Sequence, residues 1–150
     1  MRLAEALVQR ADIQKRLSQL KNRLSLNALV QEGESPSEDP HSLLKELDLL
    51  ISQLEELITG INQTNAQTMD GGESLTALLA RRDCLRAKLD TLRDFLSAAS
   101  ATVMRGTKSE VIIRSSVPVA ELQKQVDTLS KELRDLDIRI QSLNWTTDLI

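Results

Sequence analysis

The 150-residue sequence is poor in aromatic residues, with one phenylalanine, one tryptophan and no tyrosine, and it has only five glycines and three prolines. An ordinary β-sandwich and a collagen-like chain are excluded by this composition. Hydrophobic residues make up 41% of the chain, which is too much for a disordered protein. The composition also argues against a binding site that needs several aromatic rings.

Reactive and metal-binding residues are equally scarce. Cys84 is the single cysteine, so no intramolecular disulfide can form, and His41 is the single histidine, so no two-histidine metal site can form within one chain. The Glu-x-x-His pairs of di-iron helical bundles are absent, and Gly71-Gly72 lacks the ending of a phosphate-binding loop. We therefore expect no catalytic residue, no metal and no cofactor.

The charge balance argues against two classes of partner. Nineteen basic and twenty-two acidic residues give a net charge of −3, so we expect no nucleic-acid partner and no attraction to anionic lipid. The charges at Arg2, Glu5, Arg10 and Asp12 interrupt the N-terminal residues, which therefore lack the apolar core of a signal peptide, and no apolar run is long enough to span a membrane. The sequence therefore predicts a cytoplasmic protein.

Four segments, residues 2–30, 41–68, 74–105 and 119–144, have apolar residues at alternating spacings of three and four. This period predicts an all-α protein of four long antiparallel helices, bundle-like or coiled-coil-like, in a single domain over 1–150. The second segment carries an extra row, which widens its apolar face as in a bundle core: Leu44, Ile51 and Ile58.

The residues between these segments also predict where the helices begin and end. Asp39 before Pro40 predicts a helix start, Asp70-Gly71-Gly72 predicts a tight turn, and Gly106 predicts the end of the third helix. Residues 110–117 are rich in β-branched side chains and precede Pro118, which predicts a short extended segment or strand between the third and fourth helices. The chain offers no convincing second strand, so we expect its partner to be another subunit.

Polar residues interrupt the apolar pattern at one end of the expected bundle. Arg10 and Arg82 occupy apolar positions, and a buried guanidinium must be paired with a carboxylate such as Asp12 or Asp83. Three interpretations remain: a register-fixing network or subunit contact, a pocket for a small anionic or polar ligand, and solvated helix ends. Trp145 either plugs this end or contacts another subunit. The predicted cluster comprises Arg10, Asp12, Asn62, Asn65, Arg82, Asp83, Asn144 and Trp145.

A family resemblance runs over essentially the whole chain. It is carried by the order and spacing of short motifs such as Leu3-Ala4-Glu5-Ala6-Leu7, Ala80-Arg81-Arg82-Asp83 and Asn144-Trp145-Thr146. These motifs resemble the small bacterial proteins of the septicolysin-like family. The resemblance implies an all-helical bacterial protein with no catalytic residues to carry over, and the family label implies a cytolysin.

Two main functional hypotheses follow from these observations. The first is a non-enzymatic homo-oligomeric helical protein that acts through protein–protein interaction, which the leucine-rich seams and the unpaired segment 110–117 favour. The second is a membrane-active lysin, which would need its amphipathic helices to move from the core into a bilayer. A small-ligand binder that uses the polar end is a further alternative.

Overall fold

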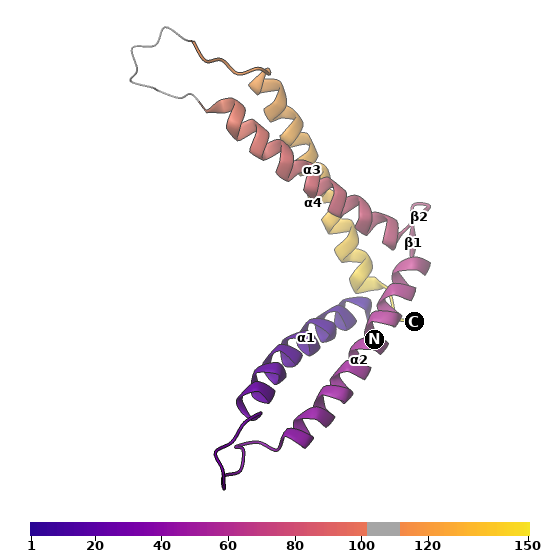
Figure 1. Cartoon of the computed structure of the whole chain (residues 1–150). Coiled ribbons are helices and arrows are strands. Elements are labelled where there is room, and N and C mark those ends of the chain that lie inside the picture. Colours follow the sequence, from indigo (N-terminus) through magenta and orange to yellow (C-terminus); the bar gives the residue numbers. More distant parts are fainter. Residues whose placement is uncertain (102–111) are drawn as a thin grey trace. The chain divides into compact units, whose positions relative to one another are not determined.

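The computed structural model describes residues 1–101 and 112–150 (Figure 1). It contains four helices, α1 (Leu3–Leu26), α2 (Pro40–Gln67), α3 (Leu75–Ser100) and α4 (Val119–Thr146). A two-stranded antiparallel hairpin, β1 (Met69–Asp70) and β2 (Glu73–Ser74), joins α2 to α3. The predicted all-α class with four long helices is confirmed, and the predicted helix end at Gly106 lies outside the described residues.

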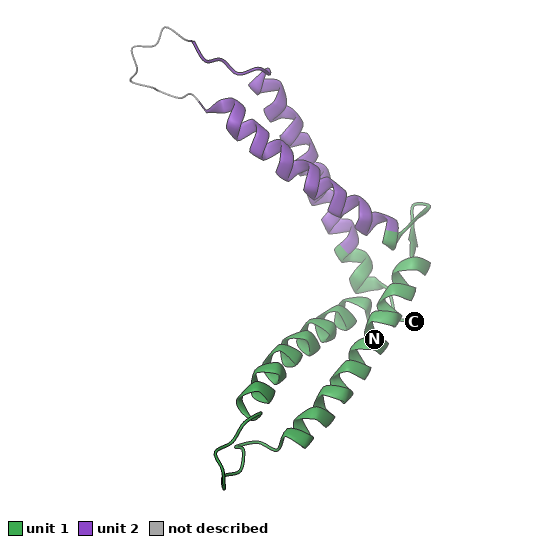
Figure 2. Ribbon diagram, viewed as in Figure 1, with its two compact units in different colours: residues 1–76, 141–150 green, residues 77–140 purple. Residues whose placement is uncertain are grey.

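The described residues form two compact units (Figure 2). The first comprises residues 1–76 and 141–150 and contains the α1–α2 pair with the last turns of α4, and the second comprises residues 77–140 and contains most of α3 and α4. The single domain over 1–150 stays a prediction.

The start of α2 agrees with the sequence in detail. Asp39 caps the helix, since its carboxylate accepts hydrogen bonds from the backbone N–H of His41 at 3.1 Å and from the Ser42 hydroxyl at 2.9 Å. Pro40 follows at the first helical position, where its missing N–H costs no hydrogen bond. The sequence therefore places the start of this helix correctly.

The core of the first unit is the leucine-rich seam between α1 and α2. Leu20 and Leu50 are completely buried, and Ile13 and Leu43 nearly so. Removing a leucine side chain of this kind from water contributes about 1.5–3 kcal/mol. The partly buried residues against this cluster continue the same three–four spacing: Leu17, Leu24, Leu47, Leu54 and Leu57.

The second apolar row of α2 is not part of that core. Leu44 and Ile51 are each 47% exposed and Ile58 is 37% exposed. The expectation that this row widens a bundle core is therefore wrong for this chain. The row points away from the seam, because residues seven apart share a helix face and the seam residues occupy another.

The turn between β1 and β2 follows from its glycines. Gly71 and Gly72 have φ values of +57° and +83°, which residues with side chains rarely adopt. Two consecutive positive φ values belong to the tight turns of two-residue hairpins, here pairing Met69 with Ser74 and Asp70 with Glu73. The predicted turn at Asp70-Gly71-Gly72 is confirmed.

The two ends of the described chain meet in the first unit. Arg2 and Asp148 form an antiparallel bridge, with backbone hydrogen bonds from Leu3 to Thr147 at 2.9 Å and from Leu149 to Met1 at 2.8 Å. Arg2 also reaches the Asp148 carboxylate at 3.0 Å. The segment after α4 is thereby fixed beside the start of α1.

The second unit is an antiparallel pair of helices linked by polar contacts along its length. Arg86 of α3 lies 3.3 Å from the Asp137 carboxylate of α4, and Arg93 donates to the Ser130 hydroxyl at 3.0 Å. Residues 112–117 are outside the helices and form no strand within the described residues, while 110 and 111 lie outside them. Of the two predicted alternatives, the strand is not formed over 112–117, since the sheet of β1 and β2 includes none of these residues, whereas a segment outside the helices between α3 and α4 agrees with the prediction.

Candidate interaction surface

The most distinctive surface of the first unit is the exposed row of α2. Leu44, Ile51 and Ile58 follow one another at intervals of seven residues, so they lie on one face of the helix. Large apolar side chains that repeat on one helix face are typical of contact with another helix. We call these three residues the α2 row.

A row of small residues on α1 lies on the same side of the α1–α2 pair. Ala11, Ser18 and Ser25 are exposed and also repeat at intervals of seven. Successive residues turn by 100° about the helix axis, and on this basis each row is rotated from the apolar seam of its own helix in the same sense. Because the two helices are antiparallel, rotations in the same sense bring both rows to the same face of the pair. We call these residues the α1 small row. Small side chains let an apolar ridge of another helix approach closely.

The two helices carry opposite charge. Helix α1 has five basic and two acidic side chains, whereas α2 has one lysine and four acidic side chains. Helix α1 therefore has a net charge of +3 and α2 a net charge of −3. A surface that spans both helices is complementary to a second copy turned so that α1 meets α2.

Polar contacts fix the connection between α1 and α2. The Arg23 guanidinium donates to both carboxylate oxygens of Glu38, at 2.7–3.2 Å, and reaches Glu46 at 3.3 Å. Asn27, which is buried, donates to the Arg23 carbonyl at 2.9 Å and accepts from the Glu38 backbone N–H at 2.9 Å. We call Arg23, Asn27 and Glu38 the connection clamp.

Ionised carboxylates are favoured at this connection. The hydrogen bond from Arg23 lowers the pKa of Glu38, against a smaller opposing effect of desolvation. The hydrogen bond from the Ser42 hydroxyl has the largest effect in lowering the pKa of Asp39, and the hydrogen bond from the backbone N–H of His41 has the next largest. The clamp and the helix cap are therefore both held by charged acceptors, which form stronger hydrogen bonds than neutral ones.

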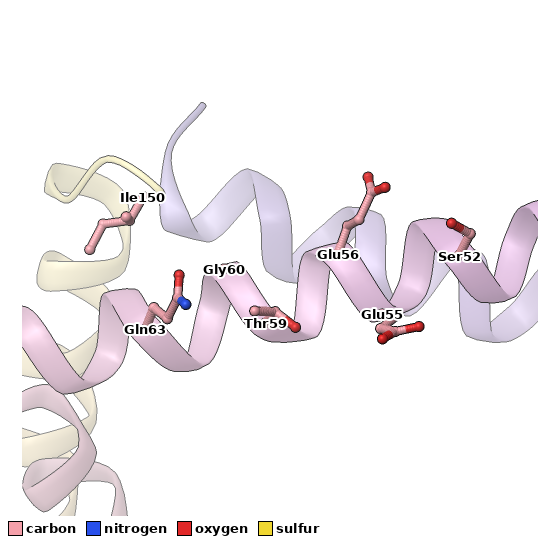
Figure 3. A pocket seen from close by; sticks show the side chains of 7 residues that line it. All are labelled: Ser52, Glu55, Glu56, Thr59, Gly60, Gln63 and Ile150. Atoms are coloured by element: carbon pink, nitrogen blue, oxygen red, sulfur yellow. The ribbon is translucent and has the colours of Figure 1, made fainter.

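Two hollows open on the surface of the first unit. One, of about 550 Å³, is open to solvent between α1 and α2 and includes Asp12, Arg16 and Gln53. The other, of about 470 Å³, lies along α2 and is lined by Glu55, Glu56 and Ile150 among others (Figure 3). In Figure 3 the two glutamate side chains point to different sides of the helix rather than converging.

The predicted polar residues divide between the two units. In the first, Arg10 and Asn65 are half-buried, Asp12 and Asn62 are exposed, and Asn144 is buried. In the second, Arg82 forms an ion pair with Asp83, with 3.1 Å between Nη2 and Oδ1. The register-fixing network and the ligand pocket stay predictions.

Trp145 of the first unit is 61% exposed, so its ring does not plug the end of a helical bundle within this chain. Sequence reasoning also missed the connection clamp. The only signal for it was Asn27, a polar residue in line with the apolar seam.

The described residues contain no cluster of three or more histidine, cysteine or acidic side chains arranged to hold a metal ion. Over the same ranges, no helix is both long enough and apolar enough to cross a bilayer. Cys84 is exposed and carries no disulfide.

Comparison with known proteins places the chain in a family. A family model described as "Family of unknown function (DUF6847)" matches residues 10–149. The chain belongs to this family. The DUF6847 match covers both units, and no curated protein matches the chain.

A solved structure supports the same fold for this DUF6847 member. It is described as a functionally unknown conserved protein from Corynebacterium diphtheriae and is 38% identical in sequence, with a TM-score of 0.93. The alignment covers 100% of this chain and 99% of the other. The expected membership of a septicolysin-like family is wrong, because the matching family is DUF6847 and no match carries that name.

Proposed function

We propose that this DUF6847 member is a cytoplasmic, non-enzymatic protein-interaction module that assembles with copies of itself. The observation that carries the proposal is the α2 row, three large apolar side chains left exposed at heptad spacing on a well-packed helix pair. The free thiol of Cys84 supports a reducing compartment.

The assembly pairs the α2 row of one copy with the α1 small row of the next. A two-fold axis makes this contact occur twice, because each copy offers both rows on one face. Basic α1 then lies against acidic α2 in both contacts, and four helices enclose a shared core. An arrangement of α2 against α2 is disfavoured, since it brings acidic helices together.

Exposed apolar residues in the second unit support the same reading. Ile112 and Ile113 are exposed, and in the described residues the segment around them has no strand partner. The proposal assigns residues 112–117 to a contact with another subunit.

Sedimentation velocity of the full chain tests the proposed assembly. Ile51→Glu adds a charge at the centre of the α2 row and is expected to convert the multimer to smaller species, with the circular dichroism spectrum unchanged. Leu49→Glu is the matched control, because Leu49 is 59% exposed on the same helix but lies on another face. This control is expected to sediment as the wild type does.

Two outcomes contradict the proposal. One is a wild-type chain that stays monomeric across the micromolar range, and the other is an equal loss of assembly in both variants. The contribution of charge pairing between α1 and α2 is tested separately, by the salt dependence of the association. The association is expected to weaken several-fold between about 0.05 and 0.5 M salt, since exposed charges are screened.

A further inference from the structure

A second apolar surface lies at the connection between α1 and α2. Leu26 is 73% exposed, Leu29 is 90% exposed and Val30 is 52% exposed. Three large apolar side chains within five residues are costly to leave in water, and such groupings mark binding surfaces more often than isolated exposed residues do. We call these three residues the connection patch.

The connection patch is held in place. Asn27, between Leu26 and Leu29, is buried and bonded to both arms of the connection, and Arg23 ties Glu38 to the last turn of α1. Further along, the Glu34 N–H donates to the Gln31 carbonyl at 3.0 Å, and Gly33 adopts a φ of +83°. A patch that is already ordered loses little conformational entropy when a partner binds.

The charge beside the patch is acidic. Residues 31–39 contain four carboxylates and no lysine or arginine. The Glu38 carboxylate is paired with Arg23 and the Asp39 carboxylate caps α2, whereas the side chains of Glu32 and Glu34 are exposed and make no hydrogen bond or ion pair in the described structure. Two carboxylates are therefore left to face a partner.

We propose that the connection patch is a docking site for another protein, one that presents an apolar segment flanked by lysine or arginine. The apolar side chains of the partner cover Leu29 and Val30, and its cations pair with Glu32 and Glu34. An anionic membrane is disfavoured, because the same two carboxylates repel it. This site is separate from the α2 row and does not rest on self-assembly.

Fluorescence anisotropy with two labelled helical peptides tests the docking site. One peptide is built from leucine and lysine and the other, of equal length, from leucine and glutamate. The full chain carries Ile51→Glu in every sample, so that self-assembly does not compete with binding. We expect the lysine peptide to bind and the glutamate peptide not to bind.

Variants then locate the contact. Leu29→Ser with Val30→Ser is expected to weaken binding by about tenfold or more, as for central apolar contacts. Glu32→Gln with Glu34→Gln is expected to weaken it by about threefold, as for rim charges. Leu49→Ser, an exposed leucine outside the patch, is the matched control and is expected to leave binding unchanged.

Asn27→Ala keeps every side chain of the patch but releases the clamp, so weaker binding in that variant supports the role of an ordered connection. The proposal is overturned if the lysine peptide does not bind, or if it binds the Leu29→Ser, Val30→Ser variant as tightly as the parent. It is also overturned if vesicles of phosphatidylglycerol bind through Leu29.

Discussion

Asn27 and Glu38 are 11 residues apart in the chain, and the backbone N–H of Glu38 donates to the Asn27 side-chain oxygen over 2.9 Å. The Asn27 amide group donates in turn to the Arg23 carbonyl. One buried side chain therefore joins the last turn of α1 to the residues that precede α2. The connection is ordered because these polar groups satisfy one another away from water.

Replacing Asn27 by alanine should destabilise the first unit. The change removes both hydrogen bonds and leaves the Glu38 N–H without its acceptor, with an expected loss of about 1–2 kcal/mol. Urea unfolding followed by circular dichroism measures the effect. Asn22→Ala is the control: Asn22 is exposed on α1, where alanine is a better helix former, so no loss is expected there.

Acid should loosen the connection. The pKa values of Glu38 and Asp39 are lowered in the folded chain, so folding favours their ionised forms. Their contribution to stability is complete above the unfolded values of about 4.3 and 3.9, and it is lost as the pH falls through the folded values. The urea midpoint measured from pH 7 to pH 3 should therefore fall on the acidic side.

Glu38→Gln should be less stable than the wild type at pH 7, and its urea midpoint should fall less steeply as the pH is lowered. Arg23 does not contribute to this slope, because its pKa is raised from an already high value and it stays protonated in both states. Glu34→Gln is the control, since the Glu34 carboxylate has no hydrogen-bond or ion-pair partner in the described residues. If the urea midpoint of Glu38→Gln fell with pH as steeply as that of the wild type, the assignment of this effect to the clamp would be contradicted.

Shortening Leu50 should affect stability far more than shortening its neighbour. Leu50 is completely buried in the α1–α2 seam, so Leu50→Ala is expected to cost about 2–5 kcal/mol. Leu49 is largely exposed, and Leu49→Ala is expected to change stability by less than about 0.5 kcal/mol. Similar denaturation midpoints for the two variants would be incompatible with the seam described here.

Thr64 should protect the last backbone amide. Its buried hydroxyl donates to the Gly60 carbonyl at 2.8 Å and accepts from the Ile150 N–H at 3.1 Å. Thr64→Val keeps the shape of the side chain but removes the acceptor, so hydrogen exchange at the Ile150 amide should become faster. Thr64→Ser keeps the hydroxyl and should retain the protection. Equal exchange rates in these two variants would show that this hydrogen bond does not protect the amide.

The polar cluster shows where prediction from sequence stops. Asn144 is buried, but Trp145 beside it is exposed, although both come directly after the last residue of the apolar heptad pattern. Periodicity identifies which side of a helix is apolar, whereas the exposure of one side chain depends on which other segment covers it. Arg82 finds its carboxylate in the adjacent Asp83, a local pairing that spacing alone could suggest.

The sequence by itself determined the four helices, the cap at Asp39 and the glycine turn after α2, because each depends on local spacing and backbone preference. Only the tertiary structure decided that Leu43 and Leu50 are buried while Leu44 and Ile51 are exposed. It also decided that Arg23 and Glu38 meet across the connection. Burial and long-range pairing are set by which helices lie against each other, and an apolar stripe has the same spacing whether its partner comes from the same chain or another.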